Sequence, residues 1–274
     1  MKIVFTDLDG TLLDHNNYSF SNAKPGLAEL KKNKIPLIIA SSKTRSEIIH
    51  WQKKLGITAP FICENGAAIF LPKKYFSFPI PRAKKNLRFD VLAISSGIKK
   101  IRTFIKLACK TGIAVEGISE MSIAKVMELT GLGRQDAIRA KRREFEEAII
   151  VGRGRKKFEA SAREKGFNLF KGGRFWHIMK GESKGFAVKK LTDLYIKEFG
   201  SCTSLGLGDS ENDFEMLRSV DCGFLVKKHD GSYSSKKFAH AKGIGPKGWN
   251  SAVLAFTKTA NGTKNANKNK FLEK

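Results

Sequence analysis

Short apolar runs alternate with helix-like stretches at both ends of this chain, and this alternation constrains its fold most. Near the N-terminus, apolar runs at residues 3–5, 35–40 and 60–63 predict buried strands. Helical spacing of apolar residues at 22–32 and 45–55 separates them. Strands that alternate with helices favour βαβ units around a parallel sheet. The chain is therefore predicted to be an α/β protein.

The pattern is lost in the middle of the chain and then returns. Helices are predicted at 185–199 and 249–257, with strands at 203–207 and 223–226. The middle carries dense basic runs, helical patterns at 98–109 and 135–147, and a β-like piece at 148–151. We expect a discontinuous core, an inserted α+β domain and a basic, Asn-rich tail that is disordered. The expected boundaries are 1–80 and 178–258 for the core, 81–177 for the insert and 259–274 for the tail.

The charge of the chain favours anionic partners. Its 274 residues carry a formal net charge of +25, so nucleic acid is an immediate candidate. Because the basic residues are spread along the whole chain, we expect no nucleic-acid partner, although a nucleic-acid-binding protein stays an alternative. The four cysteines lie far apart, which predicts neither a disulfide framework nor a zinc site.

No targeting or membrane segment is expected. Asp7 and Asp9 interrupt any apolar region of a signal peptide, and no apolar stretch approaches the roughly 18 residues of a membrane span. We therefore predict a cytoplasmic protein without a membrane partner.

Two carboxylates one residue apart, Asp7 and Asp9, directly follow the first predicted strand. Like charges at this spacing repel each other, and a divalent cation would relieve that repulsion. Phosphoryl transfer would use both carboxylates. The alternative is an ordinary Asp-Gly turn.

Further polar residues follow other predicted strands. Because sites form at the carboxyl ends of parallel strands, Asp7, Ser41, Glu64 and Asp209 are expected at one edge of the sheet. Lys184 begins a predicted helix, and Asp213 follows Asp209 closely. Two acidic clusters, a hydroxyl and a lysine are what a metal-assisted phosphoryl transfer through an aspartyl phosphate requires.

This set resembles the haloacid dehalogenase (HAD) superfamily of phosphatases. The resemblance rests on DLDGT at 7–11, Ser41, Lys184 and GDSEND at 208–213. It implies a Rossmann-like core with a parallel sheet and an inserted α+β cap domain of the C2 type. Such caps close over the site and supply substrate contacts.

The resemblance also implies roles for the two acidic clusters. Asp7 would attack phosphorus, and Asp9 would protonate the leaving alkoxide and then activate water. Mg²⁺ would be held by Asp7, the backbone carbonyl of Asp9 and Asp209. Asp213, with Asn212 assisting, would support the metal or Lys184. Asp213 has an alternative role as an acid at a helix N-terminus.

Ser41 and Lys184 complete the implied catalytic set. Ser41 would donate a hydrogen bond to a phosphoryl oxygen, and Lys184 would balance negative charge on Asp7 and the phosphoryl group. An ordinary surface lysine is the alternative for Lys184. The carboxylate at Asp9 favours hydrolysis of an alkyl phosphate, because it could protonate the leaving alkoxide and then activate water.

Longer strings resemble the mannosyl-3-phosphoglycerate phosphatases within this superfamily. They are SSKTR at 41–45, ENGA at 64–67, ELTGL at 128–132, REF at 143–145 and GGRFWH at 172–177. The family's REFSEPF string departs here at Glu146 and Ala148. Substrate contacts are expected from basic and polar side chains near the site: Ser42, Lys43, Arg45, Glu64, Asn65, Arg143, Arg174 and His177. For Arg143 a solvated helix face is the alternative, and for His177 a packed structural role.

The expected function is Mg²⁺-dependent hydrolysis of mannosyl-3-phosphoglycerate to mannosylglycerate and phosphate. The expected partner is therefore a small anionic sugar-phosphate substrate. One alternative is the same chemistry on glucosyl-3-phosphoglycerate, sucrose phosphate or a hexose phosphate. Another is a phosphomutase, which shares the aspartyl-phosphate step but returns an isomer.

Overall fold

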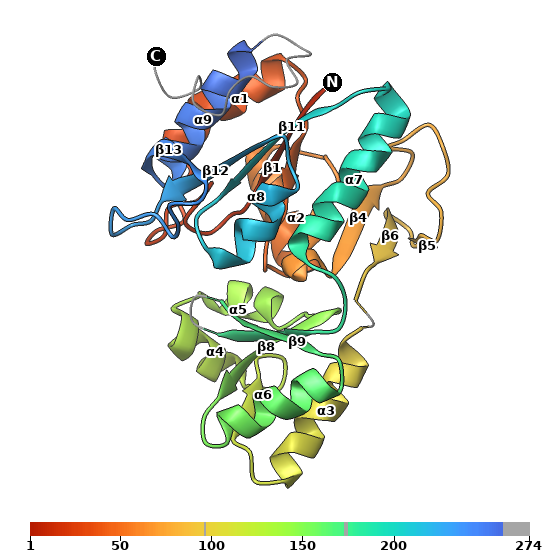
Figure 1. Cartoon of the computed structure of the whole chain (residues 1–274), viewed down its shortest axis with the longest axis vertical. Coiled ribbons are helices and arrows are strands. Elements are labelled where there is room, and N and C mark those ends of the chain that lie inside the picture. Colours follow the sequence, from red (N-terminus) through yellow and green to blue (C-terminus); the bar gives the residue numbers. More distant parts are fainter. Residues whose placement is uncertain (96, 173–174, 260–274) are drawn as a thin grey trace.

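A five-stranded parallel sheet lies at the centre of the core (Figure 1). The structure is a computed structural model, and it describes residues 1–95, 97–172 and 175–259. The strand order is β13-β12-β11-β1-β2, and every neighbouring pair is parallel. The strands are β1 (Lys2–Thr6), β2 (Leu37–Ile39), β11 (Thr203–Gly208), β12 (Cys222–Lys227) and β13 (Ala239–Ile244). The parallel α/β sheet predicted from the sequence is confirmed.

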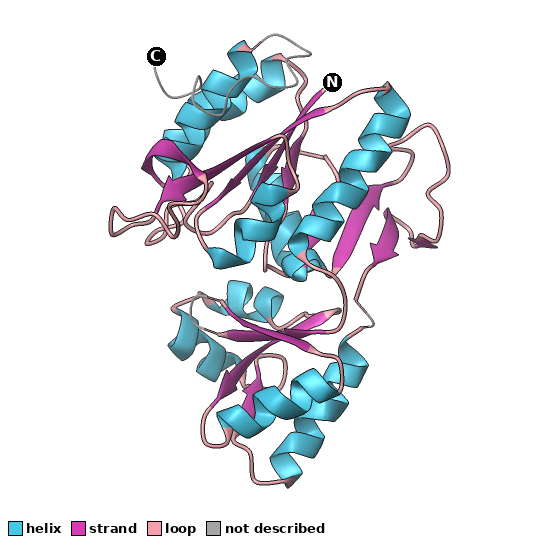
Figure 2. Cartoon of the chain, in the orientation of Figure 1, coloured by secondary structure: helices cyan, strands magenta, loops and turns pink. Residues whose placement is uncertain are grey.

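Helices cover both faces of this sheet (Figure 2). One face packs against α1 (Lys24–Lys32), α2 (Arg45–Leu55) and α9 (Pro246–Lys258), and the other against α7 (Lys184–Phe199) and α8 (Phe214–Arg218). Within β1, Val4 packs into the first layer, whereas Ile3 and Phe5 pack into the second. Burial on both faces explains why the predicted strands are continuous apolar runs.

An antiparallel sheet borders the parallel one. It has the order β3-β4-β6-β5 and is joined to the core by a parallel bridge between Ala40 and Ile62. Its strands are β3 (Phe61–Cys63), β4 (Ala68–Pro72), β5 (Lys84–Lys85) and β6 (Phe89–Ala93). The strand predicted at 60–63 is present, but its ladder partner is the antiparallel β4.

The inserted domain has its own antiparallel sheet, with the order β7-β8-β10-β9. The strands are β7 (Val115–Gly117), β8 (Glu146–Val151), β9 (Asn168–Lys171) and β10 (Trp176–Met179). One face packs against α3 (Ile98–Lys110) and α6 (Arg155–Glu164), and the other against α4 (Ile123–Thr130) and α5 (Arg134–Ala140). Ile149 and Ala148 point to opposite faces, as the alternation of a strand requires.

The helix predicted at 135–147 is wrong in its second half. Helix α5 ends at Ala140, and Glu146 already begins strand β8. The glutamates favour a helix locally, but β8 pairs with both β7 and β10, and this tertiary pairing overrides the local preference.

Strand pairing also bears on the domain boundaries. Strand β6 pairs with β4, and β5 pairs with β6, so the sheet on the core side continues beyond residue 80, whereas β10 belongs to the inserted sheet up to Met179. We therefore propose that the inserted domain, called the cap below, lies between about residues 95 and 182. The tail expected at 259–274 lies outside the described residues, apart from Thr259. Among the helices described, none has the length and apolar character needed to cross a membrane.

Candidate active site

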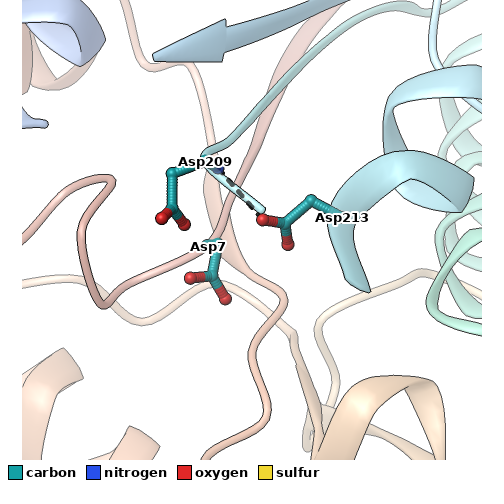
Figure 3. A group of neighbouring side chains, drawn as sticks. All are labelled: Asp7, Asp209 and Asp213. Carbon is teal, nitrogen blue, oxygen red and sulfur yellow. Dashed lines mark hydrogen bonds between the residues drawn. The ribbon is translucent and has the colours of Figure 1, made fainter. Parts of the chain in front are cut away.

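The parallel pairing of β1 with β11 brings the two acidic motifs together. Thr6 lies opposite Leu207, and the backbone N–H of Asp7 donates to the Leu207 carbonyl at 2.9 Å. Asp7 and Asp209 therefore leave adjacent strands at the same edge, although they are far apart in the sequence. The predicted edge of the sheet is the place where the carboxylates gather (Figure 3).

Three carboxylates form the centre of the site. Asp7, Asp209 and Asp213 each place one carboxylate oxygen within 4.8 Å of the others (Figure 3). Asp213 is held rigidly, because its Oδ2 accepts the backbone N–H groups of Asp209 at 3.0 Å and Ser210 at 3.2 Å. Hard oxygen donors grouped in this way suit a divalent cation such as Mg²⁺.

Lys184 is the cation of this cluster. Its Nζ lies 2.7 Å from Asp213 Oδ1 and 3.3 Å from Asp7 Oδ1, and all three side chains are buried. Burial lowers the pKa of Lys184, but Asp213 and Asp7 outweigh it and hold this pKa above its ordinary value. The alternative of a surface lysine is therefore wrong.

Lys184 balances only part of the negative charge that the three carboxylates would carry. Burial raises the pKa of Asp7 to about 7; Lys184 opposes this rise, and Asp213 and Asp9 add to it. The pKa of Asp209 is raised well above its ordinary value, first by burial and then by Asp213 and Asp7. A bound cation would relieve this repulsion, so the residues present fit one.

Asp9 lies beside this cluster but faces a different cation. Its Oδ2 forms an ion pair with Lys43 Nζ at 2.8 Å, and Lys43 lies 3.7 Å from Glu47 Oε1. The other oxygen, Oδ1, is buried and has no hydrogen-bond partner among the described residues. One oxygen of Asp9 is thus oriented by Lys43 while the other is available to a reacting group.

Ser41 and Asn212 occupy loops around the carboxylates. Ser41 is buried just after β2, and its carbonyl accepts the backbone N–H of Asn65 at 3.0 Å. Asn212 accepts from Ser210 Oγ at 2.8 Å and donates to Asn65 Oδ1 at 3.3 Å. Thr11, which the sequence analysis left without a role, donates to Asp209 Oδ1 at 3.3 Å. The DLDGT motif contains this hydroxyl and was the signal for it.

Gly66 allows the helix that carries Lys184 to approach closely. Its φ of +98° is left-handed, and a Cβ there would lie 2.6 Å from the Lys184 Cα. Glycine is the residue that accepts both conditions. The close packing of the loop at 64–66 against the start of α7 thereby helps to place Lys184 beside Asp7, which follows β1.

Glu64 links the core to the cap. Its buried carboxylate accepts the backbone N–H groups of Glu144 at 3.0 Å, Phe145 at 2.8 Å and Glu146 at 2.7 Å. Burial raises its pKa to about 7, opposed by Arg143. Both oxygens are engaged by the cap backbone, and the contact with sugar hydroxyls stays a prediction.

The predicted basic contacts are also engaged at the junction of core and cap. Arg143 donates to Glu146 Oε1 at 2.7 Å and to the Ser42 carbonyl at 3.2 Å, and it is buried. The solvated helix face considered for Arg143 is therefore wrong. Arg45 forms an ion pair with Glu144 at 2.7 Å.

His177 is buried, and its Nδ1 lies 2.7 Å from Oε1 of Glu146, a carboxylate of the cap. Arg174 lies outside the described residues. Roles in substrate binding for both residues stay predictions.

Comparisons with known proteins agree with this geometry. The family model described as haloacid dehalogenase-like hydrolase matches residues 4–89. The chain is 41% identical to glucosyl-3-phosphoglycerate/mannosyl-3-phosphoglycerate phosphatase of Methanococcoides burtonii, over 92% of this chain and 96% of the relative. It is 36% identical to mannosyl-3-phosphoglycerate phosphatase of Pyrococcus furiosus, over 82% and 91% of the two chains.

A solved structure extends the comparison to the fold. The crystal structure of protein 0175 from Thermoplasma acidophilum is 18% identical, with a TM-score of 0.66 over 93% of this chain and 98% of that one. At this identity the similarity establishes the architecture of core and cap and nothing beyond it. With relatives 41% and 36% identical along most of its length, the chain belongs to the haloacid dehalogenase-like hydrolases and is a phosphatase of that superfamily.

Proposed function

We propose that this phosphatase hydrolyses glycosyl-3-phosphoglycerates, releasing phosphate and a glycosylglycerate. The observation that carries the proposal is the group formed at one edge of the sheet by the buried Asp7, Asp213 and Lys184 and the half-buried Asp209. The names of two relatives supply the substrate class: one acts on both glucosyl- and mannosyl-3-phosphoglycerate, the other on the mannosyl compound.

Asp7 is the proposed nucleophile. A carboxylate oxygen of Asp7 forms a bond to phosphorus while the bond between phosphorus and the glycerate oxygen breaks, leaving an aspartyl phosphate. Asp9 donates its proton to the departing alkoxide. It then takes a proton from water, which attacks phosphorus, releases phosphate and restores the Asp7 carboxylate. The unpaired, buried Oδ1 of Asp9 supports this assignment.

Three further side chains would stabilise the charge that develops in the reaction or orient Asp9. Lys184, 3.3 Å from Asp7, balances the negative charge that collects on the phosphoryl oxygens. Ser41 donates a hydrogen bond to one of these oxygens. Lys43 orients Asp9 through their 2.8 Å ion pair.

Mg²⁺ is the proposed cofactor. Asp7, Asp209 and the Asp9 backbone carbonyl would hold it, and Asp213 would keep Lys184 and the 209–210 backbone in place. When bound, the cation supplies Lewis-acid polarisation of the phosphoryl group and relieves the repulsion between the carboxylates. The Asp213 oxygens are already committed to Lys184 and two amides, which favours this division of roles.

A substrate panel tests the proposed function. Phosphate release is measured with Mg²⁺ present for mannosyl- and glucosyl-3-phosphoglycerate, sucrose phosphate and hexose phosphates. We expect kcat/KM for both glycosyl-3-phosphoglycerates to exceed that for the hexose phosphates by at least about 100-fold, which corresponds to about 2.7 kcal/mol. Faster turnover of a hexose phosphate would refute the substrate class. An isomer formed without release of phosphate would instead identify a phosphomutase.

A further inference from the structure

A second buried carboxylate, Glu146, lies outside the catalytic group. It begins strand β8 of the cap and is completely buried. Its Oε1 lies 2.7 Å from both Arg143 Nη1 and His177 Nδ1, and its Oε2 accepts from Asn65 Nδ2 at 2.7 Å. Asn65 belongs to the core and the other three residues to the cap. Glu146 is thus a junction where one carboxylate holds groups from both domains.

The register of strands β8 and β10 explains how Glu146 and His177 meet. In the antiparallel pair of β8 and β10, His177 lies opposite Ala148 and Met179 lies opposite Glu146. His177 and Glu146 are therefore diagonal neighbours on one face of the sheet. This face is the one turned toward Asn65, so the imidazole and the carboxylate reach the core together.

Because Glu146 is buried, its carboxylate oxygens need hydrogen-bond partners at fixed positions. A buried carboxylate is costly unless its oxygens are paired, and here both oxygens have strong partners. Burial opposes ionisation, but His177, Arg143 and Asn65 together lower the pKa of Glu146 below its ordinary value. A displacement of the cap relative to the core would break the bond from Asn65 to Glu146 Oε2 and the bond from Arg143 to the Ser42 carbonyl, and it would leave Glu146 Oε2 buried without its partner.

The junction connects directly to the phosphoryl site. Asn65 Oδ1 accepts from Asn212 at 3.3 Å, and Asn212 accepts from Ser210, the neighbour of Asp209, at 2.8 Å. Arg143 also donates to the carbonyl of Ser42, which follows Ser41. These hydrogen bonds connect the cap sheet to two of the loops that surround the catalytic carboxylates.

On the cap side, the junction fixes the imidazole. The His177 ring stacks on Phe170 of β9, with centroids 5.4 Å apart and planes 11° from parallel. A Cβ on Gly172 would lie 2.5 Å from His177 Nε2, so the end of β9 packs tightly against the ring. Glu146 therefore holds His177 of β10 directly, and the His177 ring in turn packs against β9.

We propose that Glu146 is a positioning residue for substrate selection: it aligns the cap strands β9 and β10 with the phosphoryl site. The inference rests on the proposed function. A substrate that extends from the core site to the cap needs both surfaces in one register. A small phosphate ester needs only the core. Loss of the junction should therefore penalise the extended substrate alone.

The variant Glu146→Gln tests this, because the amide keeps the volume of the carboxylate but not its charge. We expect KM for mannosyl-3-phosphoglycerate to rise at least about 10-fold, equivalent to about 1.4 kcal/mol. For p-nitrophenyl phosphate, kcat/KM should stay within about twofold of wild type. The matched control is Glu116→Gln, whose side chain forms an exposed ion pair with Lys125 in the same cap. It should change neither value.

Two variants of His177 provide an independent arm that leaves Glu146 in place. His177→Asn keeps a donor near the position of Nδ1, whereas His177→Leu removes it. We expect His177→Leu to reproduce the rise in KM and His177→Asn to restore at least half of the lost binding free energy. This arm also decides the matter if Glu146→Gln does not fold.

The outcomes separate the inference from the proposed function. Wild-type KM for the extended substrate in Glu146→Gln and His177→Leu overturns the inference, and so does an equal loss on both substrates. If wild type prefers a different sugar phosphate, the proposed function fails. The effects of the same variants are then measured with that ester and with p-nitrophenyl phosphate, and the comparison tests the inference unchanged.

Discussion

Lys184 Nζ lies 2.7 Å from Asp213 Oδ1, and both side chains are almost completely inaccessible to solvent. The other oxygen of Asp213 accepts two backbone N–H groups, from Asp209 and Ser210. Asp213 thus ties the lysine of one motif to the backbone of another. This contact favours the proposed role of Asp213 as a support for the metal site over that of only an acid near a helix N-terminus.

Replacing Asp213 by asparagine should weaken metal binding without unfolding the protein. The asparagine side chain would keep one acceptor for the backbone amides but lose the ion pair to Lys184. Groups that support metal ligands typically contribute about 10- to 100-fold in affinity, so we expect a loss of that size. The measurement is the Mg²⁺ concentration that gives half-maximal kcat. Asp193→Asn, at an exposed position of α7, is the control and should leave that concentration unchanged.

Mg²⁺ should stabilise the fold, because it neutralises carboxylates that repel one another. A ligand at about 100 times its Kd adds about 2.7 kcal/mol to the free energy of unfolding. We expect Tm to rise on addition of Mg²⁺, and chelation to abolish both this rise and the activity. In Asp7→Asn the metal-free protein should be more stable than wild type, since one repelling charge is gone. A lower Tm for this metal-free variant would contradict the repulsion.

Gly66→Ala should lower both stability and kcat. Alanine there adopts a left-handed φ and also places its Cβ 2.6 Å from the backbone of Lys184. Gly112 separates the two effects, because its φ is +81° but nothing lies within 4 Å of its Cβ position. We expect Gly112→Ala to cost about 1 kcal/mol and keep full activity. Equal losses of kcat in the two variants would show that the contact with Lys184 is unimportant.

Glu64 should make stability fall as the pH rises from about 4.5 to about 7. Burial raises its pKa from 4.5 to about 7, so the folded protein holds a proton that the unfolded chain has already lost. Stability from this group is complete below its ordinary pKa of 4.5 and disappears as the pH passes about 7. The wild-type free energy of unfolding should fall on the order of 3 kcal/mol relative to Glu64→Gln between about pH 4 and 8. Denaturant titrations of both proteins measure it, and a constant difference would contradict this account.

Local signals predicted the core elements well. The helix expected at 45–55 is α2 (Arg45–Leu55), because Thr44 and Glu47 form a capping box and Gly56 ends the helix with a left-handed φ. In the cap, by contrast, α6 was hidden in a basic run. Phe158 and Ala162, four residues apart, are the apolar signal that it carries.

In the candidate site, too, some residues could be placed from the sequence and others could not. Asp7 and Asp209 could be placed from the sequence, because the ends of parallel strands converge whatever lies between them. The partners of Glu64 and Arg143 could not, since they depend on how the cap lies against the core. No local pattern distinguishes a carboxylate that meets a sugar from one that accepts three backbone amides.

The most direct test of the account compares phosphate release from mannosyl-3-phosphoglycerate by wild type and Asp7→Asn, with saturating Mg²⁺. The asparagine fills the same space but is not a nucleophile toward phosphorus. We expect Mg²⁺-dependent release by wild type and a loss of kcat of at least about 1,000-fold in the variant, equivalent to about 4 kcal/mol. Hydrolysis by Asp7→Asn at the wild-type rate would contradict the proposed mechanism.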